Sequence, residues 1–251
     1  MKLNDCNILY INLKRRKDRN NYIKNQLDQL GLKYKRINAV DGRNFTQDEK
    51  DFYNSRSNFN VMDKNKDQIY GKAGCYLSHM NCLKYAIDNK YQNLLVIEDD
   101  CTFLTDKNPN YKFDIPKDTY LYYLGGLFWP KTKPFIPKNE YTSLDNIPID
   151  TEHFKIACTV AYIIPTYDRI CEVYNIMTSK MKKAVDMMYV CHIQKKYPCY
   201  IHNPPLCLQS DFVSDVTNLD KKTPKKPFNN DYFYVKDKDN EKNARKFWKQ
   251  F

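Results

Sequence analysis

A short apolar segment that ends in three consecutive acids constrains the fold of this chain more than any other feature. Residues 94–97 read Leu-Leu-Val-Ile, and Glu98, Asp99 and Asp100 follow at once. A continuous apolar run of this length is typical of a strand buried on both faces of a parallel sheet. Doubly wound α/β sheets bind their ligands beyond the carboxyl ends of such strands. Hard divalent cations prefer oxygen ligands, so the acids are candidates for a metal site, with a solvated acidic turn as the alternative.

The N-terminal region predicts a strand, a helix and a second strand in succession. β-prone residues cluster over 7–13, apolar residues recur at helical spacing over 18–30, and residues 33–37 again favour a strand. A β-α-β unit of this kind predicts two parallel strands in one sheet.

Strands and helices continue to alternate through most of the chain, which favours an α/β fold. We predict further strands over 121–124, 159–164 and 199–202, and further helices over 46–55, 72–89, 166–177 and 185–194. Thr46-Gln-Asp-Glu49 is a capping box at the start of the first of these helices.

Three connecting segments differ from the predicted strands and helices in composition. Residues 58–68 are polar and favour a loop, and residues 128–150 contain four prolines and form a candidate lid or binding loop. Gly125-Gly126 ends the strand at 121–124 and would permit either close approach of a ligand or a turn.

The composition suits one globular domain with a basic appendage. We expect a domain over 1–219 and a Lys/Asn-rich tail over 220–251. The net charge is +11 at pH 7, which an anionic nucleotide substrate, an anionic surface or a nucleic acid would each explain. The sequence has no recognised nucleic-acid-binding motif, so nucleic acid is the least favoured of these partners.

Targeting signals and cysteine usage both favour a cytoplasmic protein. The sequence has no run of about 18 apolar residues, so we expect no transmembrane segment. The N-terminal sequence lacks the apolar core and cleavage site of a secretory signal. The nine cysteines are scattered, odd in number and without a C-x-x-C pair, which favours reduced thiols.

Eight short motifs occur in order along residues 7–216, and together they resemble one known family. The motifs are Ile11-Asn12-Leu13-x-x-Arg16-x-x-Arg19, Ala39-Val40-Asp41-Gly42, Gly74-Cys75-Tyr76-Leu77-Ser78-His79, Val96-Ile97-Glu98-Asp99-Asp100, Tyr122-Tyr123-Leu124-Gly125-Gly126, Ala161-Tyr162-Ile163-Ile164, Val185-Asp186, and Pro205 with Gln209 and Ser214-Asp215. In this order they resemble glycosyltransferase family 25, which includes bacterial lipopolysaccharide galactosyltransferases and the catalytic domains of collagen galactosyltransferases. One departure is Pro165, where the lipopolysaccharide enzymes often have a serine.

The resemblance implies a GT-A type fold, in which one α/β domain with a mainly parallel central sheet and helices on both faces binds a nucleotide-sugar. It also implies an inverting mechanism and a divalent cation, usually Mn²⁺, with Glu98-Asp99-Asp100 as the counterpart of an Asp-x-Asp motif. We expect Asp100 to be a direct metal ligand and Glu98 a direct or water-mediated one. Successive side chains of a strand alternate, so Asp99 would instead hold hydroxyls of the ribose or the sugar.

Several residues are candidates for binding a UDP-sugar donor. Arg16 and Arg19 follow the first strand, and guanidinium groups suit phosphate oxygens. The neighbouring Lys14 and Arg15 favour a solvated charge run. The resemblance implies that Asn12 and Leu13 border the uracil through their backbone.

Further donor-binding candidates lie in the loop after the second strand and on the helix before the acids. Asp41 would bind the nucleoside or cap the Asp-Gly turn, and Lys72 is a candidate contact of the diphosphate. Ser78 is a candidate donor contact. His79 favours a hydrogen-bonded core position over a ligand role, and adjacent helix residues do not face each other, so Ser78 and His79 do not form a nucleophile pair.

Inverting transfer needs a general base that takes the proton of the acceptor hydroxyl. Asp186 is the first candidate, with Asp211 and Asp215 after it; the alternative for Asp186 is a helix N-terminal acid that complements the helix dipole. The sequence therefore predicts a metal-dependent transferase that moves a hexose, galactose or glucose, from a UDP-sugar to a glycan or protein hydroxyl. The alternatives are a catalytically silent UDP-sugar-binding module and, less favoured, a nucleic-acid-binding protein.

Overall fold

The fold is described from a computed structural model. It describes residues 1–55, 66–104, 111–129, 145–152, 155–179, 183–210, 212 and 214–216. The predicted tail over 220–251, most of the candidate lid, the polar loop up to residue 65 and Asp211 lie outside the described residues.

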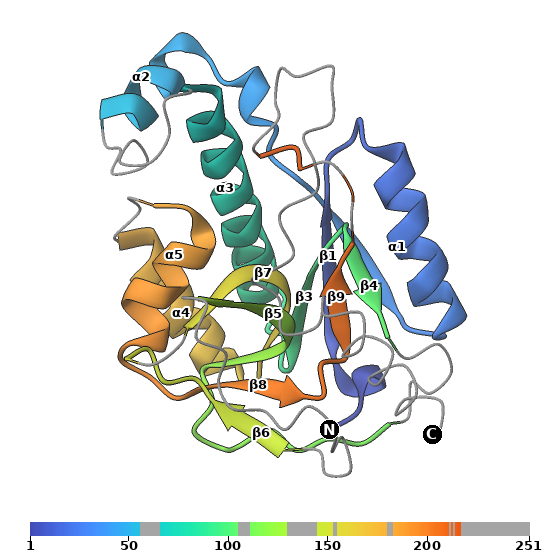
Figure 1. Cartoon of the computed structure of the whole chain (residues 1–251). Helices are drawn as coiled ribbons and strands as arrows, with labels where there is room; N and C mark the ends of the chain where they lie inside the picture. Colours follow the sequence, from blue (N-terminus) through green and yellow to red (C-terminus); the bar gives the residue numbers. More distant parts are fainter. Residues whose placement is uncertain are drawn as a thin grey trace.

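A seven-stranded mixed sheet forms the centre of the described part of the chain, in the order β2-β1-β3-β7-β5-β8-β6 (Figure 1). The strands are β1 (Asn7–Asn12), β2 (Tyr34–Asn38), β3 (Leu94–Glu98), β5 (Leu121–Trp129), β6 (Asp145–Pro148), β7 (Lys155–Ile164) and β8 (Cys199–Asn203). The pairings make β2, β1, β3, β5 and β8 run in one direction, whereas β7 and β6 run in the other. The predicted α/β fold with a mainly parallel sheet is therefore confirmed.

Helices cover both faces of this sheet. The helix α1 packs on one side, whereas α3 packs on the other side together with α4 and α5 (Figure 1). Their bounds are α1 (Lys17–Gln29), α2 (Gln47–Ser55), α3 (Lys66–Asp88), α4 (Tyr167–Ser179) and α5 (Val185–Tyr189). In the described part of the chain no helix combines the length and apolarity needed to cross a membrane.

The capping box that the sequence predicts is present at the start of α2. The backbone N–H of Glu49 donates to the Thr46 hydroxyl at 3.3 Å, and the backbone N–H of Thr46 donates to the Glu49 carboxylate at 2.8 Å. These two bonds satisfy donors that the first turn of a helix leaves without partners.

Two local predictions were wrong, whereas the predicted helix over 185–194 is helical throughout, as α5 followed by a π-helical turn, Val190–Gln194. The helix α3 begins at Lys66 rather than Lys72, so part of the predicted loop is helical. Gly125-Gly126 lies inside β5, where the pairing with β7 shifts register. A Cβ on Gly125 would lie 1.9 Å from the carbonyl oxygen of Cys207, which belongs to the two-stranded sheet described next, so this glycine permits close approach between the two sheets.

A second, two-stranded sheet, which the sequence did not suggest, lies directly after the acids. It pairs β4 (Cys101–Phe103) with β9 (Cys207–Gln209) in antiparallel fashion, with Cys101 opposite Gln209. This pairing brings the region around residue 209 beside the end of β3.

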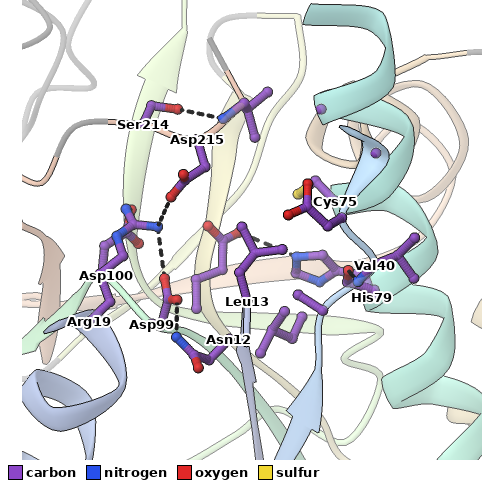
Figure 2. Close-up of a pocket in the computed structure, with 18 of the residues that line it drawn as sticks. Asn12, Leu13, Arg19, Val40, Cys75, His79, Asp99, Asp100, Ser214 and Asp215 are labelled. Atoms are coloured by element: carbon purple, nitrogen blue, oxygen red, sulfur yellow. Dashed lines mark hydrogen bonds and ion pairs between the residues drawn. The ribbon is translucent and has the colours of Figure 1, made fainter. Parts of the chain in front are cut away.

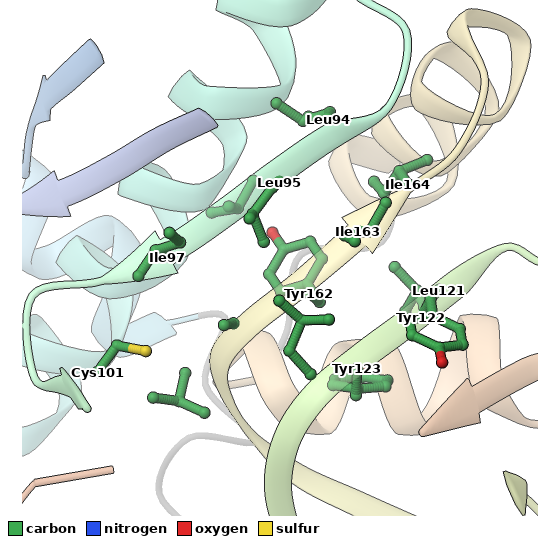
Figure 3. Packing of buried hydrophobic residues seen from close by; sticks show 14 of the residues in the cluster. Leu94, Leu95, Ile97, Cys101, Leu121, Tyr122, Tyr123, Tyr162, Ile163 and Ile164 are labelled. Carbon is green, nitrogen blue, oxygen red and sulfur yellow. The ribbon is translucent and has the colours of Figure 1, made fainter. Parts of the chain in front are cut away.

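The core behind the acids consists of aliphatic and tyrosine side chains. In the sheet, Leu95 of β3 lies opposite Ile163 of β7 and Val96 lies opposite Tyr162, which in turn pairs with Tyr123 of β5 (Figure 3). All five are fully buried. Burial on both faces of β3 matches its continuous apolar sequence and holds its last residue rigidly at the sheet edge.

Candidate functional site

A pocket opens where the parallel strands β1 and β3 end. It lies between α3 on one side and the segment around residues 214–216 on the other (Figure 2). Its lining residues are Ile11, Asn12, Leu13, Arg15, Arg19, Ala39, Val40, Asp41, Gly42, Gly71, Cys75, Ser78, His79, Glu98, Asp99, Asp100, Gln209, Ser214, Asp215 and Val216. The carboxyl edge of a doubly wound sheet is the usual place for a ligand.

Register explains why residues far apart in sequence meet in this pocket. Ile11 of β1 pairs with Glu98 of β3, so Asn12 lies beside the acids. The Asn12 amide donates to the Asp99 carboxylate at 2.6 Å and to the Arg16 carbonyl at 3.0 Å. Asn12 therefore positions both the acidic turn and the loop that leads into α1.

Arg19 lies between two of the three acids. Its guanidinium donates to Asp99 at 2.8 Å and to Asp100 at 2.6 Å, and all three side chains are less than 10% exposed. The Gln209 amide also donates to Asp100, at 3.2 Å. The predicted phosphate ligand Arg19 thus serves as the counter-ion of the acids in this structure.

One buried guanidinium does not balance the negative charge of this turn. Burial raises the pKa of Asp99 to about 7, and the nearby Asp100 and Glu98 add to that increase although Arg19 opposes it. Burial likewise raises the pKa of Asp100. A cation bound beside these carboxyl groups would favour their ionised form and so lower their pKa values.

Glu98 has different neighbours from the other two acids. His79 Nε2 lies 3.3 Å from its carboxylate, and the Thr159 hydroxyl donates a short hydrogen bond to it. The other ring nitrogen of His79 is 3.0 Å from the Tyr162 hydroxyl, which is 2.9 Å from that of Tyr189. His79 is fully buried, so this chain of polar groups holds Glu98 from the core side.

Three arginines converge on Asp215 at the opposite wall of the pocket. Arg15 donates to it at 2.5 Å, Arg16 through a shorter contact, and Arg19 lies 3.6 Å away. Arg15 also donates to Asp41 at 2.8 Å. Arg15, which the sequence analysis treated as solvated, therefore belongs to the pocket, since only the fold reveals its partner 200 residues away.

Ser78 holds the loop that carries Asp41. Its hydroxyl accepts from the Val40 backbone N–H at 2.9 Å and donates to the Gly74 carbonyl at 2.6 Å. A Cβ on Gly74 would lie 2.5 Å from the Val40 carbonyl oxygen, so only glycine allows α3 to approach this closely. Asp41 itself caps a short 3-10 helix by accepting from the backbone N–H of Arg43 at 3.2 Å.

The candidate bases lie in different surroundings. Asp186 is in the first turn of α5 and accepts from the Met187 backbone N–H at 2.7 Å. Burial raises the pKa of Asp186 and the nearby Glu98 carboxylate adds to the increase, whereas Lys72 opposes it. Lys72 and Asp186 are outside the residues that line the pocket. Asp215 is occupied by arginines, and Asp211 lies outside the described residues.

Several residues of the site had no role assigned from the sequence. Cys75 was noted only as part of a motif, and Thr159 was not singled out, because a threonine within a strand carries no local signal. Gln209 was noted only as part of a motif, and the β4–β9 pairing places it beside Asp100. The spacing of Cys75 and His79, four residues apart on one helix, could have indicated that they share a face.

Comparisons with known proteins concern the family of the chain. The family model described as "Glycosyltransferase family 25 (LPS biosynthesis protein)" matches residues 6–195. "Procollagen galactosyltransferase 2" of Mus musculus is 35% identical over 98 residues, which cover 38% of this chain and 16% of that protein. A "Glycosyltransferase 25 family member" of Aedes aegypti is 32% identical over 104 residues, 41% of this chain and 17% of that protein.

These relatives are much longer than the part that they share with this chain, which aligns with about a sixth of their length. A solved structure described as "crystal structure of a glycosyltransferase involved in the glycosylation of the major capsid of PBCV-1" aligns with 79% of this chain and 82% of its own. Its TM-score is 0.37 at 8% identity, and this similarity is too low for an inference about the site. The family match covers most of the sequence and confirms the resemblance of its ordered motifs: the chain belongs to glycosyltransferase family 25.

Proposed function

We propose that this protein is a metal-dependent, inverting glycosyltransferase that moves a hexose from a UDP-sugar to a hydroxyl group of a glycan or of a hydroxylysine-type side chain. The observation that carries the proposal is the excess of buried carboxylates over cations in the pocket at the ends of β1 and β3. The names of the animal relatives favour galactose as the sugar.

The acidic turn has oxygens that suit a divalent cation such as Mn²⁺. Asp100 Oδ1 is buried and has no hydrogen-bond partner among the described residues, and the Glu98 side chain is 21% exposed in the pocket. Asp100 and Glu98 would hold the cation, and Asp99 is already held by Asn12 and Arg19. When bound, the cation would act as a Lewis acid that stabilises the departing diphosphate.

The arginines on the opposite wall suit the diphosphate of the donor. Arg15 and Arg16 bind the carboxylate of Asp215. Guanidinium groups bind phosphate oxygens in the same forked geometry as carboxylates, so a diphosphate would take the place of Asp215 between them. Asp41 and Leu13 line the pocket next to them and would border the nucleoside. Asn12 and Ser78 would support the donor by fixing the loops around it.

Asp186 is the proposed general base. Its raised pKa makes it a stronger proton acceptor than an ordinary aspartate. An acceptor hydroxyl that approached from the α5 side would lose its proton to Asp186 as the sugar departs from the diphosphate. Asp211 and Asp215 are the alternative bases.

The direct test is turnover of a panel of UDP-sugars with Mn²⁺, with and without acceptor sugars. Asp100→Asn should lower turnover on the order of 100-fold or more, because metal stabilisation of the leaving group contributes several kcal/mol. Asp88→Asn is a matched control, since Asp88 is exposed and pairs with Lys84 on the surface, and it should behave as the wild type. Equal turnover in the wild type and Asp100→Asn would refute the metal assignment.

A second measurement separates the enzyme from a silent binding module. Thermal shift with UDP, Mn²⁺ or both should show strong stabilisation only when both are present, because the acids would supply only part of the cation's ligands. UDP binding without release of sugar from any donor would contradict catalysis and favour the silent module.

A further inference from the structure

Three side chains of different chemistry converge beside the acidic turn. Cys75 and His79 lie one turn apart on α3, facing the pocket (Figure 2). The Cys75 sulfur, a His79 ring nitrogen and a Glu98 carboxylate oxygen all lie within 4.8 Å of one another. Bonds of 2.0–2.3 Å to a common tetrahedral centre place ligand atoms about 3–4 Å apart, so small side-chain movements would bring these three groups onto one ion.

The surroundings orient two of these groups as metal ligands are usually oriented. The Tyr162 hydroxyl lies 3.0 Å from Nδ1 of His79, so the ring presents Nε2 to Glu98 at 3.3 Å. Thr159 donates to the Glu98 carboxylate. Metal-bound histidines and carboxylates characteristically have such second hydrogen-bond partners, which fix their tautomer and orientation.

The chemistry of the set selects a class of ion. One sulfur, one imidazole nitrogen and one carboxylate suit Zn²⁺ and similar borderline ions, whereas Mn²⁺ prefers oxygen ligands alone. Three protein ligands leave a fourth tetrahedral position, and all three residues line the pocket, so a water molecule or a donor oxygen can complete the shell.

We propose that Cys75, His79 and Glu98 form a binding site for a zinc-class cation. This site differs in ligand chemistry from the Mn²⁺ site proposed above but shares Glu98 with it. Zn²⁺ at this site would therefore compete with Mn²⁺ for Glu98 and, if the proposed function holds, inhibit Mn²⁺-supported sugar transfer.

Co²⁺ is the probe for the binding test, because it replaces Zn²⁺ and absorbs light when a thiolate binds it. The full chain, freed of metal, is titrated with Co²⁺ and then with Zn²⁺. We expect a thiolate-to-cobalt charge-transfer band that saturates at one equivalent and disappears on addition of Zn²⁺. Cys75→Ser should abolish the band, whereas the matched control Cys171→Ser, on α4, should retain it.

A second variant tests the orientation of the histidine without removing a ligand. Tyr162→Phe should weaken Zn²⁺ binding by roughly 10–100-fold, as loss of such an outer partner does elsewhere, while the band persists at high Co²⁺. No band in the wild type, or an unchanged band in Cys75→Ser, would overturn the proposal. An unchanged Zn²⁺ affinity in Tyr162→Phe would also contradict it.

These readouts need no enzyme activity, so they remain decisive if the protein transfers no sugar. If transfer is observed, Zn²⁺ should inhibit the wild type at least tenfold more strongly than it inhibits Cys75→Ser. Equal inhibition would refute the competition at Glu98.

Discussion

Arg19 offers the sharpest test of how the acidic turn is held together. Replacement by alanine would remove the guanidinium that bridges Asp99 and Asp100 and leave both carboxylates buried without it. Removal of one partner of a buried ion pair costs about 3–5 kcal/mol. We expect the lower end, about 3 kcal/mol, because Asn12 and Gln209 still donate to the acids.

The assay is urea unfolding followed by circular dichroism at pH 7.5 with a chelator present. Lys84→Ala is the control, because it breaks an exposed i,i+4 pair with Asp88 and should cost less than about 1 kcal/mol. Arg19→Lys should fall between the two, since a single ammonium keeps the charge but cannot match the fork that reaches both carboxylates.

If Arg19→Ala lowers the free energy of unfolding by less than about 1 kcal/mol, the reasoning is refuted, because the folded acids would then not depend on their buried counter-ion. An Arg19→Lys variant as stable as the wild type would show that charge alone suffices and that the bridging geometry contributes little.

Two further predictions concern the fold around the site. Gly125→Ala should cost about 3 kcal/mol in urea unfolding, because its Cβ would meet the Cys207 carbonyl oxygen at 1.9 Å; Gly126→Ala should cost less, since the nearest atom to its Cβ is a side-chain methyl group of Ile156, at 2.6 Å. Burial lowers the pKa of His202 to about 4. As pH drops from about 6.5 to 4, the unfolded chain therefore binds a proton at His202 that the folded chain does not, and the free energy of unfolding should fall by up to about 3 kcal/mol. His202→Asn keeps a donor for the Pro204 carbonyl that His202 contacts at 2.6 Å and should flatten this dependence; an equal pH slope in both proteins would contradict it.

Local sequence patterns predicted the elements whose signals lie within a few residues. The apolar run before Glu98 forms a fully buried strand, and the capping box at Thr46 starts a helix. Periodicity and capping are properties of neighbouring residues, so they can be read without knowledge of the fold. The order of such elements, together with the motifs, was enough for the α/β fold and the family.

The roles of individual charged side chains depended on contacts between distant segments. Arg15 and Asp215 are 200 residues apart in sequence, and no local pattern marks Arg15 as different from the other cations of its loop. Gly125-Gly126 looked like a strand end, yet both glycines lie within β5, where the Cys207 backbone approaches Gly125 closely.

The sequence by itself determined that three acids end a buried strand and that their neighbours match one family. The tertiary structure alone decided how those acids differ. Asp99 and Asp100 share Arg19 from α1, whereas Glu98 faces His79 from α3. The physical reason is that Glu98 is the last strand residue and faces the helix on one side of the sheet, whereas Asp99 and Asp100 follow in a turn that brings both toward the helix on the other side, and only the packed fold determines which partners wait there.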